Sequence, residues 1–472
     1  MATAPDHPFR LRPIRHWPGQ SLSLSLGRAT GLRVSPGASF MGVYGLAHAA
    51  KSLVWQVSET LFAFFLTEAV GLPPATMGWI LAASLAVNAV GDLAVGGYLA
   101  RRVRTVADAG RAQRVGALAA GAAFALFSLS ALMPGTARIP FVLVTILLFR
   151  LAYPLVDNPQ NAMLALATDD DSGRVRLSVV RYTTAGVSSL AIALAVMPLV
   201  DHRHADLRAL AFAVLAGGLA LGLAASALAL DRRARMPEGL PIRGRTTDGA
   251  GRARGSAPIG APIVFGSIFA FAICNAVFGK LLPYFTAFAS ASVLSGGILM
   301  SCMAIGRFLS QFLWSGLARR HSVICTLRVA AICWAAGALA FSQYRTGGLP
   351  LLGIAGLLYG AGCGGVLMAL WALAAAAAHG EAAPRPATIV FGRLTFCSKL
   401  GSASAFLVIA WFLTGTTYRQ ASTFAGGVTP VMVAAPVLGA LACLLFSFVP
   451  GRARRRALTP SRWMPGARRT GA

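Results

Sequence analysis

The chain has 472 residues, of which 56% are hydrophobic and only 12% are charged, so its composition is that of a membrane protein rather than a soluble globular domain. The formal net charge of +27 would suit a nucleic-acid partner, but most of the positive residues lie in the loops between apolar segments or in the terminal stretches, which argues against one. All seven cysteines lie in apolar segments without metal-ligand spacing, and we expect neither a disulfide nor a metal site.

Twelve apolar segments follow one another along the chain, and most reach the roughly 20 residues that a helix needs to cross a bilayer. We therefore predict an all-α integral membrane protein with twelve transmembrane helices. The segments lie near residues 40–68, 76–100, 115–134, 139–167, 178–200, 207–230, 262–289, 291–317, 322–343, 348–378, 387–412 and 424–449.

Residues 231–261 divide the chain, because this stretch is rich in Arg, Gly and Pro and has no apolar periodicity, which is typical of a flexible linker. Six predicted helices precede it in residues 41–230, and six follow it in residues 262–449. Two six-helix halves joined by a long cytoplasmic loop are the arrangement of major-facilitator transporters. In such folds the substrate site lies between the halves, near the bilayer midplane.

Arginines mark alternate loops of this predicted arrangement. The N-terminal stretch, the even-numbered loops and the C-terminal stretch carry 29 arginines, while the odd-numbered loops carry 5. Positive loops remain in the cytoplasm, so the asymmetry predicts a multi-pass protein of the bacterial inner membrane with both termini cytoplasmic. Residues 450–472 then form a basic cytoplasmic tail. Residues 1–40 fit either a disordered basic cytoplasmic tail or a stretch ahead of a start at Met41.

The chain has only three lysines, Lys51, Lys280 and Lys399, and all three lie inside apolar segments, as do the acids Asp92 and Asp157. A charge inside the bilayer costs about 2.5–3.5 kcal/mol on insertion scales, so it persists where it has a partner, faces a water-filled cavity or takes part in chemistry. Buried ions of both signs therefore indicate a pathway for a polar solute. The alternatives are structural ion pairs, such as Asp92 with Lys51, and a Lys280 that extends toward the membrane interface.

Helical spacing places these polar side chains on common faces. A carboxylate beside a polar cavity can hold a proton or another cation, and its occupation can shift the balance between two states of a transporter. The polar stripes comprise Lys51, Trp55, Ser58 and Glu59 in the first segment, Asn88 and Asp92 in the second, Arg150, Tyr153, Asp157 and Asn161 in the fourth, Arg181, Thr184 and Ser188 in the fifth, and Thr395, Lys399 and Ser402 in the eleventh.

Four stretches of the sequence resemble a known transporter family. They are Phe65-Leu-Thr-Glu-Ala-Val-Gly-Leu72, Asn88-Ala-Val-Gly-Asp92, Tyr153-Pro-Leu-Val-Asp-Asn-Pro159 and Thr395-x-x-x-Lys399-x-Gly-Ser402. Together they resemble the glycoside–pentoside–hexuronide:cation symporters, a family of the major facilitator superfamily whose type member is the melibiose permease. The resemblance covers most of both halves and is strongest over residues 51–190.

This resemblance implies a central site in which Asp92, with Asn88 and Asp157, serves the coupling cation. It also implies a substrate cavity lined by Lys51, Asp157, Arg181, Trp371, Thr395 and Lys399. Four positions depart from the family pattern: Ser52 and Asn88 stand where the family has acids, Pro154 where it has a threonine, and Asn161 where it has an aromatic residue. Because Na⁺ needs several oxygen ligands, these losses favour a proton over sodium as the coupling ion.

We therefore predict a secondary active transporter that moves a small polar solute, such as a sugar, a glycoside or a uronate, by cation-coupled alternating access with proton symport. Two alternatives stay open: a lipid or amphipath carrier on the same scaffold, and a transporter-like sensor or assembly factor that no longer transports. The sequence has no nucleophile–base set and no nucleotide-binding loop, so we expect neither an enzyme nor a cofactor. The expected partners are a small-molecule substrate and the lipid bilayer, without nucleic acid, and the expected state is a monomer.

Overall fold

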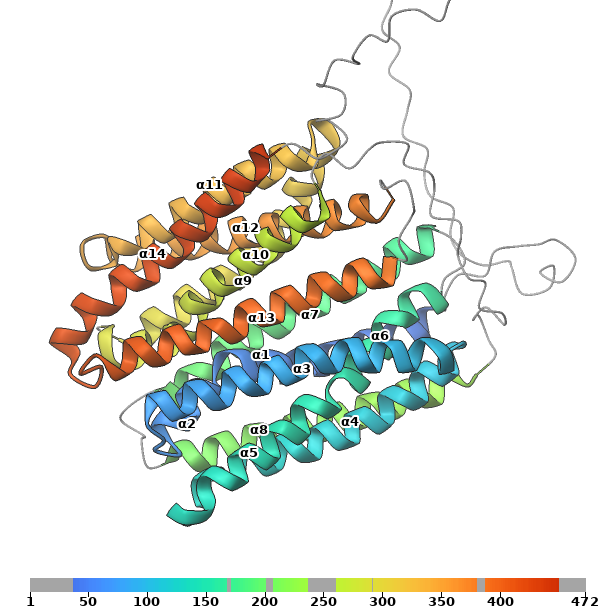
Figure 1. The fold of residues 1–472 in the computed structure, drawn as a ribbon, viewed down its shortest axis with the longest axis horizontal. Helices are drawn as coiled ribbons and strands as arrows, with labels where there is room; N and C mark the ends of the chain where they lie inside the picture. Colours follow the sequence, from blue (N-terminus) through green and yellow to red (C-terminus); the bar gives the residue numbers. More distant parts are fainter. Residues whose placement is uncertain are drawn as a thin grey trace, which may run out of the picture.

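The computed structural model describes residues 37–167, 171–200, 207–236, 260–290, 292–379 and 387–449. Within these residues every regular element is a helix, and most of the helices run roughly side by side (Figure 1). The predicted tails 1–40 and 450–472 and the middle of the predicted linker 231–261 lie outside this part of the chain, apart from residues 37–40.

Helices α1 to α8 correspond to the first six predicted segments, because two of those segments are each divided into two helices. The first is divided at Leu61, where φ is −106°, although backbone hydrogen bonds continue across the bend from Leu61 to Val57 and from Phe65 to Leu61. The fourth is divided at Pro154, which has no N–H to continue the helical ladder. The bounds are α1 Ala38–Thr60, α2 Phe62–Glu68, α3 Pro74–Arg102, α4 Val106–Ser128 with the 3-10 turn Leu129–Leu132, α5 Gly135–Ala152, α6 Pro154–Leu166, α7 Asp171–Val200 and α8 Arg208–Ala234.

Helices α9 to α14 correspond to the last six predicted segments. The hydroxyls of Ser292 and Ser322 cap the starts of α10 and α11 by accepting backbone N–H bonds. Helix α12 bends at Gly348, where φ is +61°, in the left-handed region that favours glycine. The bounds are α9 Ala261–Tyr284 with the π-helical turn Phe285–Ala289, α10 Val293–Arg320, α11 Val323–Ser342, α12 Tyr344–His379, α13 Ala387–Thr414 and α14 Ala421–Phe448.

Eleven helical segments of the described chain are long and apolar enough to cross a membrane. The segment formed by α1 and α2 is not among them and carries the charged residues Lys51 and Glu59, but it packs against the spanning helices α7 and α8 and covers a similar length. We count it as the twelfth crossing. The prediction of an all-α, twelve-helix, multi-pass membrane protein is thereby confirmed.

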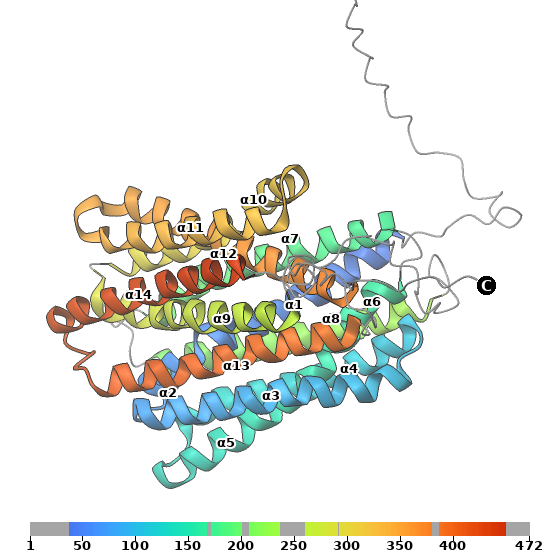
Figure 2. The same ribbon diagram turned by 45° about the horizontal axis from the view of Figure 1, so that its top comes forward.

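The helices form two groups, α1 to α8 and α9 to α14, which meet along two main seams. Helix α3 packs against α13, and α7 packs against α10, while α1 and α2 also touch α9 (Figure 2 shows α13 directly beside α3). At the first seam, Gly78 approaches Ala410 so closely that no side chain would fit. At the second, a Cβ on Gly186 would lie 2.9 Å from the Phe308 ring. Small residues therefore allow the two groups to touch closely.

Within each group the helices are packed tightly. In the first group, the ring of Phe62 lies 4.3 Å from that of Phe127 and 5.8 Å from that of Phe124. In the second group, α12 packs backbone to backbone against its neighbours, because Gly306 of α10 and Gly337 of α11 face the α12 main chain directly. Interiors packed in this way resist local deformation, so each group can act as a rigid unit.

The two ends of the bundle carry different loops. We call one the Glu68 end, where α2 finishes and α14 starts, and the other the Arg102 end, where α3 and α10 finish. In Figure 1 the Glu68 end is on the left, near the label of α2, and α6 lies toward the opposite end.

Candidate functional site

Lys51 and Asp157 form an ion pair inside the first helix group. Lys51 Nζ on α1 lies 2.7 Å from Asp157 Oδ1 on α6, and Asn161 donates a hydrogen bond to the other carboxylate oxygen at 3.0 Å. Pro154 begins α6 and so places Asp157 in the first turn, where the helix dipole favours a negative charge. The Lys51 side chain is 4% exposed and that of Asp157 is 28% exposed, so only the carboxylate reaches open space. The alternative in which Lys51 pairs with Asp92 is wrong.

A second ion pair joins the two helix groups. Lys399 on α13 pairs with Asp92 on α3, and Lys399 Nζ also donates to Asn88 Oδ1 at 2.7 Å. The Asn88 amide is held at its other end, because its Nδ2 donates to the carbonyl of Arg150 at 2.6 Å. That carbonyl has lost its helical donor, since Pro154 four residues later has no N–H. Asn88 therefore connects the break in the fourth segment to the cation on the other group.

A third cluster places Glu59 between two cations. Lys280 Nζ on α9 lies 2.7 Å from Glu59 Oε2 and 2.9 Å from the Glu59 backbone carbonyl, and Arg150 Nη2 on α5 lies 3.6 Å from Glu59 Oε1. The Lys280 side chain is 3% exposed and also lies 4.0 Å from the centre of the Phe406 ring. The alternative in which Lys280 extends toward the membrane interface is therefore wrong, because Glu59 neutralises it inside the protein.

The ring of Trp55 lies close to members of two of these clusters. Lys399 Nζ lies 5.0 Å and the Arg150 guanidinium 5.3 Å from the ring centre, and the Tyr153 ring is 4.9 Å away. Cations are attracted to the faces of aromatic rings, so Trp55 links cations from both helix groups. Asp157 interacts electrostatically with Lys399 as well as with Lys51, which connects all three clusters into one network.

Arg181 lies on α7, half-buried, at the edge of this network. Its charge acts on both Asp157 and Lys51, which places it within electrostatic reach of the first ion pair. Helix α7 is held against α1 here, because Ser188 donates a hydrogen bond to the carbonyl of Ala49 at 3.1 Å. The structure thus places the predicted residue Arg181 within electrostatic range of Lys51 and Asp157.

Trp371 and Thr395 both belong to the second helix group, on α12 and α13. The Trp371 ring on α12 stacks on that of Phe391 on α13, with centroids 5.4 Å apart. Phe391, Thr395 and Lys399 follow one another at four-residue intervals and share one face of α13. The Thr395 hydroxyl donates to carbonyls of its own helix. The structure therefore places Trp371 and Thr395 on the face that leads to Lys399, without direct contact to the ion pairs.

Three residues of the network were not among the predicted site residues. Glu59 and Arg150 lie in polar stripes that the sequence reveals, whereas Lys280 is a single charge in an apolar segment, and its partner Glu59 is 221 residues away. The complete network contains an excess of positive charge. It comprises the carboxylates of Glu59, Asp92 and Asp157 and the cations of Lys51, Arg150, Arg181, Lys280 and Lys399.

The two helix groups are joined at the Glu68 end by further polar contacts. The hydroxyls of Thr67 and Tyr284 lie 2.8 Å apart, Tyr418 donates to Glu68 Oε1 at 2.7 Å, and Arg419 Nε lies 3.3 Å from Glu68 Oε2. Burial, together with the neighbouring Glu68 carboxylate, raises the pKa of Tyr418, so its phenol stays protonated and continues to donate. These contacts at the Glu68 end and the central network both join the two groups.

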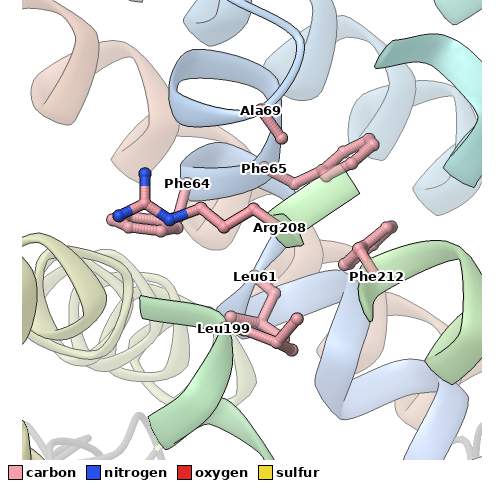
Figure 3. Close-up of a pocket in the computed structure, with 7 residues that line it drawn as sticks. All are labelled: Leu61, Phe64, Phe65, Ala69, Leu199, Arg208 and Phe212. Atoms are coloured by element: carbon pink, nitrogen blue, oxygen red, sulfur yellow. The ribbon is translucent and has the colours of Figure 1, made fainter. Parts of the chain in front are cut away.

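A small pocket also lies near the Glu68 end but is separate from the ion network. Figure 3 shows its lining, which is apolar except for the arginine side chain that extends across the ring of Phe64. None of the carboxylates of the network contributes to it, so its chemistry does not suit a coupling cation. The lining residues are Leu61, Phe64, Phe65, Ala69, Leu199, Arg208 and Phe212.

Comparison with known proteins identifies the family. The family described as MFS/sugar transport protein matches residues 43–450, which is most of the chain. The chain belongs to this family. Members of the MFS/sugar transport family are transporters rather than enzymes, and the predicted resemblance to glycoside and cation symporters is confirmed.

Two curated relatives resemble part of the chain. YagG of Escherichia coli K12, named as a candidate glycoside/cation symporter, is 33% identical over 159 residues, which make up 34% of this chain and 34% of YagG. The inner membrane symporter YicJ of the same organism is 26% identical over 179 residues, which make up 38% of each chain. The match therefore spans only about a third of the length of these relatives.

Solved structures confirm the fold of this MFS/sugar transport protein. A mutant of the nucleoside transporter NupG superposes with a TM-score of 0.62 at 12% identity and covers 87% of this chain and 100% of that one. A mutant of the peptide transporter POT gives a TM-score of 0.61 at 13% identity, over 86% of this chain and 94% of that one. At such low identity the similarity shows the major-facilitator fold alone.

Proposed function

We propose that this protein is a secondary active transporter of the bacterial inner membrane that moves a small polar solute by cation-coupled alternating access, with the proton as coupling ion. The observation that carries the proposal is the ion pair between Asp92 and Lys399, which connects the two helix groups through a largely buried carboxylate. Protonation of Asp92 would remove one charge of this pair and weaken the contact between the groups. Ion binding would thereby change the relative populations of the two states.

The orientation of the protein follows from its arginines. The loops at the Arg102 end are the arginine-rich ones, so this end and residues 231–261 face the cytoplasm, together with both termini. The Glu68 end then faces outward, and the contacts of Thr67, Glu68, Tyr284 and Tyr418 close the outer side. Under this assignment the structure is closed on its outer side, and residues 41–230 and 262–449 are the two moving halves.

The charges of the network support a sugar-like solute that carries an anionic group, such as a uronate. The network contains more cations than carboxylates, and an anionic group on the substrate would compensate the excess. Asp157 is 28% exposed and could accept hydrogen bonds from sugar hydroxyls, while Arg181 beside it could bind the anionic group. The ring of Trp371 offers an apolar face for a sugar ring.

The arrangement around Asp92 favours a proton over sodium. Its neighbour Asn88 already uses both ends of its amide, one on the Arg150 carbonyl and one on Lys399. Few oxygens are therefore free to complete a shell around Na⁺, which needs several ligands. A single carboxylate, in contrast, suffices to bind one proton.

Uptake by purified protein in proteoliposomes tests this function. A uronate, a neutral glycoside and a lysolipid are supplied in parallel, each under an imposed pH gradient and an imposed sodium gradient. We expect the uronate to accumulate most strongly, and the pH gradient to drive it. Movement of the lysolipid alone would favour a lipid carrier, and uptake that follows sodium but ignores pH would refute proton coupling.

A further inference from the structure

Glu59 is held between a cation of its own helix group and a cation of the other. Arg150 belongs to α5 of the first group, as Glu59 does, and Lys280 belongs to α9 of the second. Lys280 Nζ donates hydrogen bonds to both Glu59 Oε2, at 2.7 Å, and the Glu59 backbone carbonyl, at 2.9 Å. Glu59 Oε1 is buried, lies 3.6 Å from Arg150 Nη2 and has no hydrogen-bond partner. Of the two cations, only Lys280 of the other helix group therefore donates hydrogen bonds to Glu59.

The guanidinium of Arg150 correspondingly lacks hydrogen-bond partners in this state. Its side chain is 0% exposed, yet none of its three guanidinium nitrogens has a hydrogen-bond partner among the described residues. Its other neighbours are the rings of Trp55, Phe62 and Phe149, at 5.3, 5.9 and 5.6 Å. Aromatic faces attract the cation but accept no strong hydrogen bonds, so the buried donors stay unsatisfied. The guanidinium and Glu59 Oε1 are placed to form the missing bond.

The position of Glu59 links this cluster to the closed end of the bundle. Glu59 precedes Glu68 by nine residues, which corresponds to about 14 Å along a helix. The Glu59–Lys280 contact therefore lies between the contacts at the Glu68 end and the central ion pairs. If the two helix groups separate at the Glu68 end, α1 and α2 move away from α9, and this contact must break.

We infer that Glu59 exchanges partners during the transport cycle, with Lys280 holding it while the Glu68 end is closed and Arg150 holding it while that end is open. A buried carboxylate without a cation is strongly unfavourable, and the exchange keeps Glu59 paired in both states. Lys280 then enters the opened, hydrated side and keeps its contact with the Phe406 ring. Lys280 and Arg150 act as positioning residues that set the relative populations of the two states. The inference rests on the alternating access proposed above.

Distances between spin labels test the exchange in purified protein without any substrate. One label pair, at Thr136 and Thr346, spans the Glu68 end, and a second, at Thr105 and His321, spans the Arg102 end. The seven native cysteines are replaced beforehand. Each variant is measured alone and together with Gly78→Val, whose side chain would clash with Ala410 and so populate the state that is open at the Glu68 end.

The two cations should have opposite effects. Lys280→Met removes the partner of the closed state and should raise the ratio of open to closed at the Glu68 end at least about tenfold, or about 1.4 kcal/mol. Arg150→Met removes the partner of the open state and should lower the same ratio about tenfold. If Arg150→Met does not yield folded protein, Arg150→Lys, which keeps a charge but loses the forked donors, should shift the ratio in the same direction by less. Arg235→Met, which leaves Asp231 paired with Arg114, is the control and should change neither distance.

The outcomes separate this inference from the proposed function. If Lys280→Met and Arg150→Met shift the ratio in the same direction, or leave it unchanged while Gly78→Val shows two distances, the exchange is refuted and alternating access stands. If no variant, including Gly78→Val, gives a second distance at either end, alternating access itself fails and the exchange fails with it. The double change Glu59→Lys with Lys280→Glu restores a pair between the groups but repels Arg150, so it should keep the Glu68 end closed.

Discussion

The unequal burial of Lys51 and Asp157 predicts unequal consequences of breaking their ion pair. Asp157→Asn removes the negative charge and leaves the Lys51 ammonium, which is 4% exposed, inside the protein. Lys51→Met leaves a carboxylate that is 28% exposed and still accepts a hydrogen bond from Asn161. Stranding a buried charge costs about 3–5 kcal/mol, so we expect a loss of this size for Asp157→Asn. The loss for Lys51→Met should be smaller, about 1–3 kcal/mol, because water and Asn161 still solvate the acid.

Thermal unfolding in one detergent and at one scan rate checks this order. The double variant is the most informative, because replacing both members of a buried pair by uncharged residues removes the stranded ion. Adding Lys51→Met to Asp157→Asn should therefore raise the unfolding temperature rather than lower it further. Arg235→Met serves as the control, since Arg235 is 46% exposed and should contribute at most about 1 kcal/mol. The reasoning fails if Asp157→Asn is no less stable than Lys51→Met, or if the double variant is the least stable of the three.

Three further predictions concern coupling and the contact between the helix groups. Asp92→Asn should abolish gradient-driven accumulation in proteoliposomes but leave equilibration of the solute. Normal accumulation by this variant would mean that another acid carries the coupling. Asn88→Asp should increase any response of uptake to a sodium gradient. Gly78→Val should separate the groups at the Glu68 end, whereas Gly97→Val, which meets no atom within 4 Å, should not, as judged by labelling of cysteines at that end. Glu68→Gln should weaken the contact between the groups at the Glu68 end more than Arg419→Gln does. The reason is that the Glu68 side chain is 5% exposed and also binds Tyr418, while the Arg419 side chain is 61% exposed. Equal effects of the two variants on cysteine labelling would contradict this prediction.

The sequence alone predicted the number and placement of the helices. Bilayer thickness sets a length that apolar segments must reach, and arginines mark the loops between them. Local breaks were less evident. Pro154 ends a helical ladder for a reason that is visible in the sequence, whereas Leu61 is an ordinary helical residue and nothing at that position marks the bend. The structure confirms the fold class but divides two of the expected helices.

The residues of the site were partly predictable, but their pairing was not. Spacing along one helix shows which residues share a face, and it placed Asp92 with Asn88 correctly on α3. It does not show which helix lies opposite. The partners Lys51 and Asp157 are 106 residues apart, and Asp92 and Lys399 are 307 apart. Such pairs form only when tertiary packing sets the order of the helices, and so the partner of Lys280 also remained unknown from sequence.

The glycine contacts of α12 have a consequence for how mutational data on this protein should be interpreted. Gly360 faces the carbonyl of Met303, and Gly362 faces the main chain at Trp334, with no room for even one methyl group. Alanine at either position would force two helices of the second group apart. In a saturation library selected for growth on a transported nutrient, these glycines should therefore score as intolerant as Asp92 or Lys399. Fitness scores alone would therefore not separate glycines needed for helix packing from residues needed for transport. A separate measurement of protein abundance would distinguish them, because only the packing variants should lower the amount of folded protein.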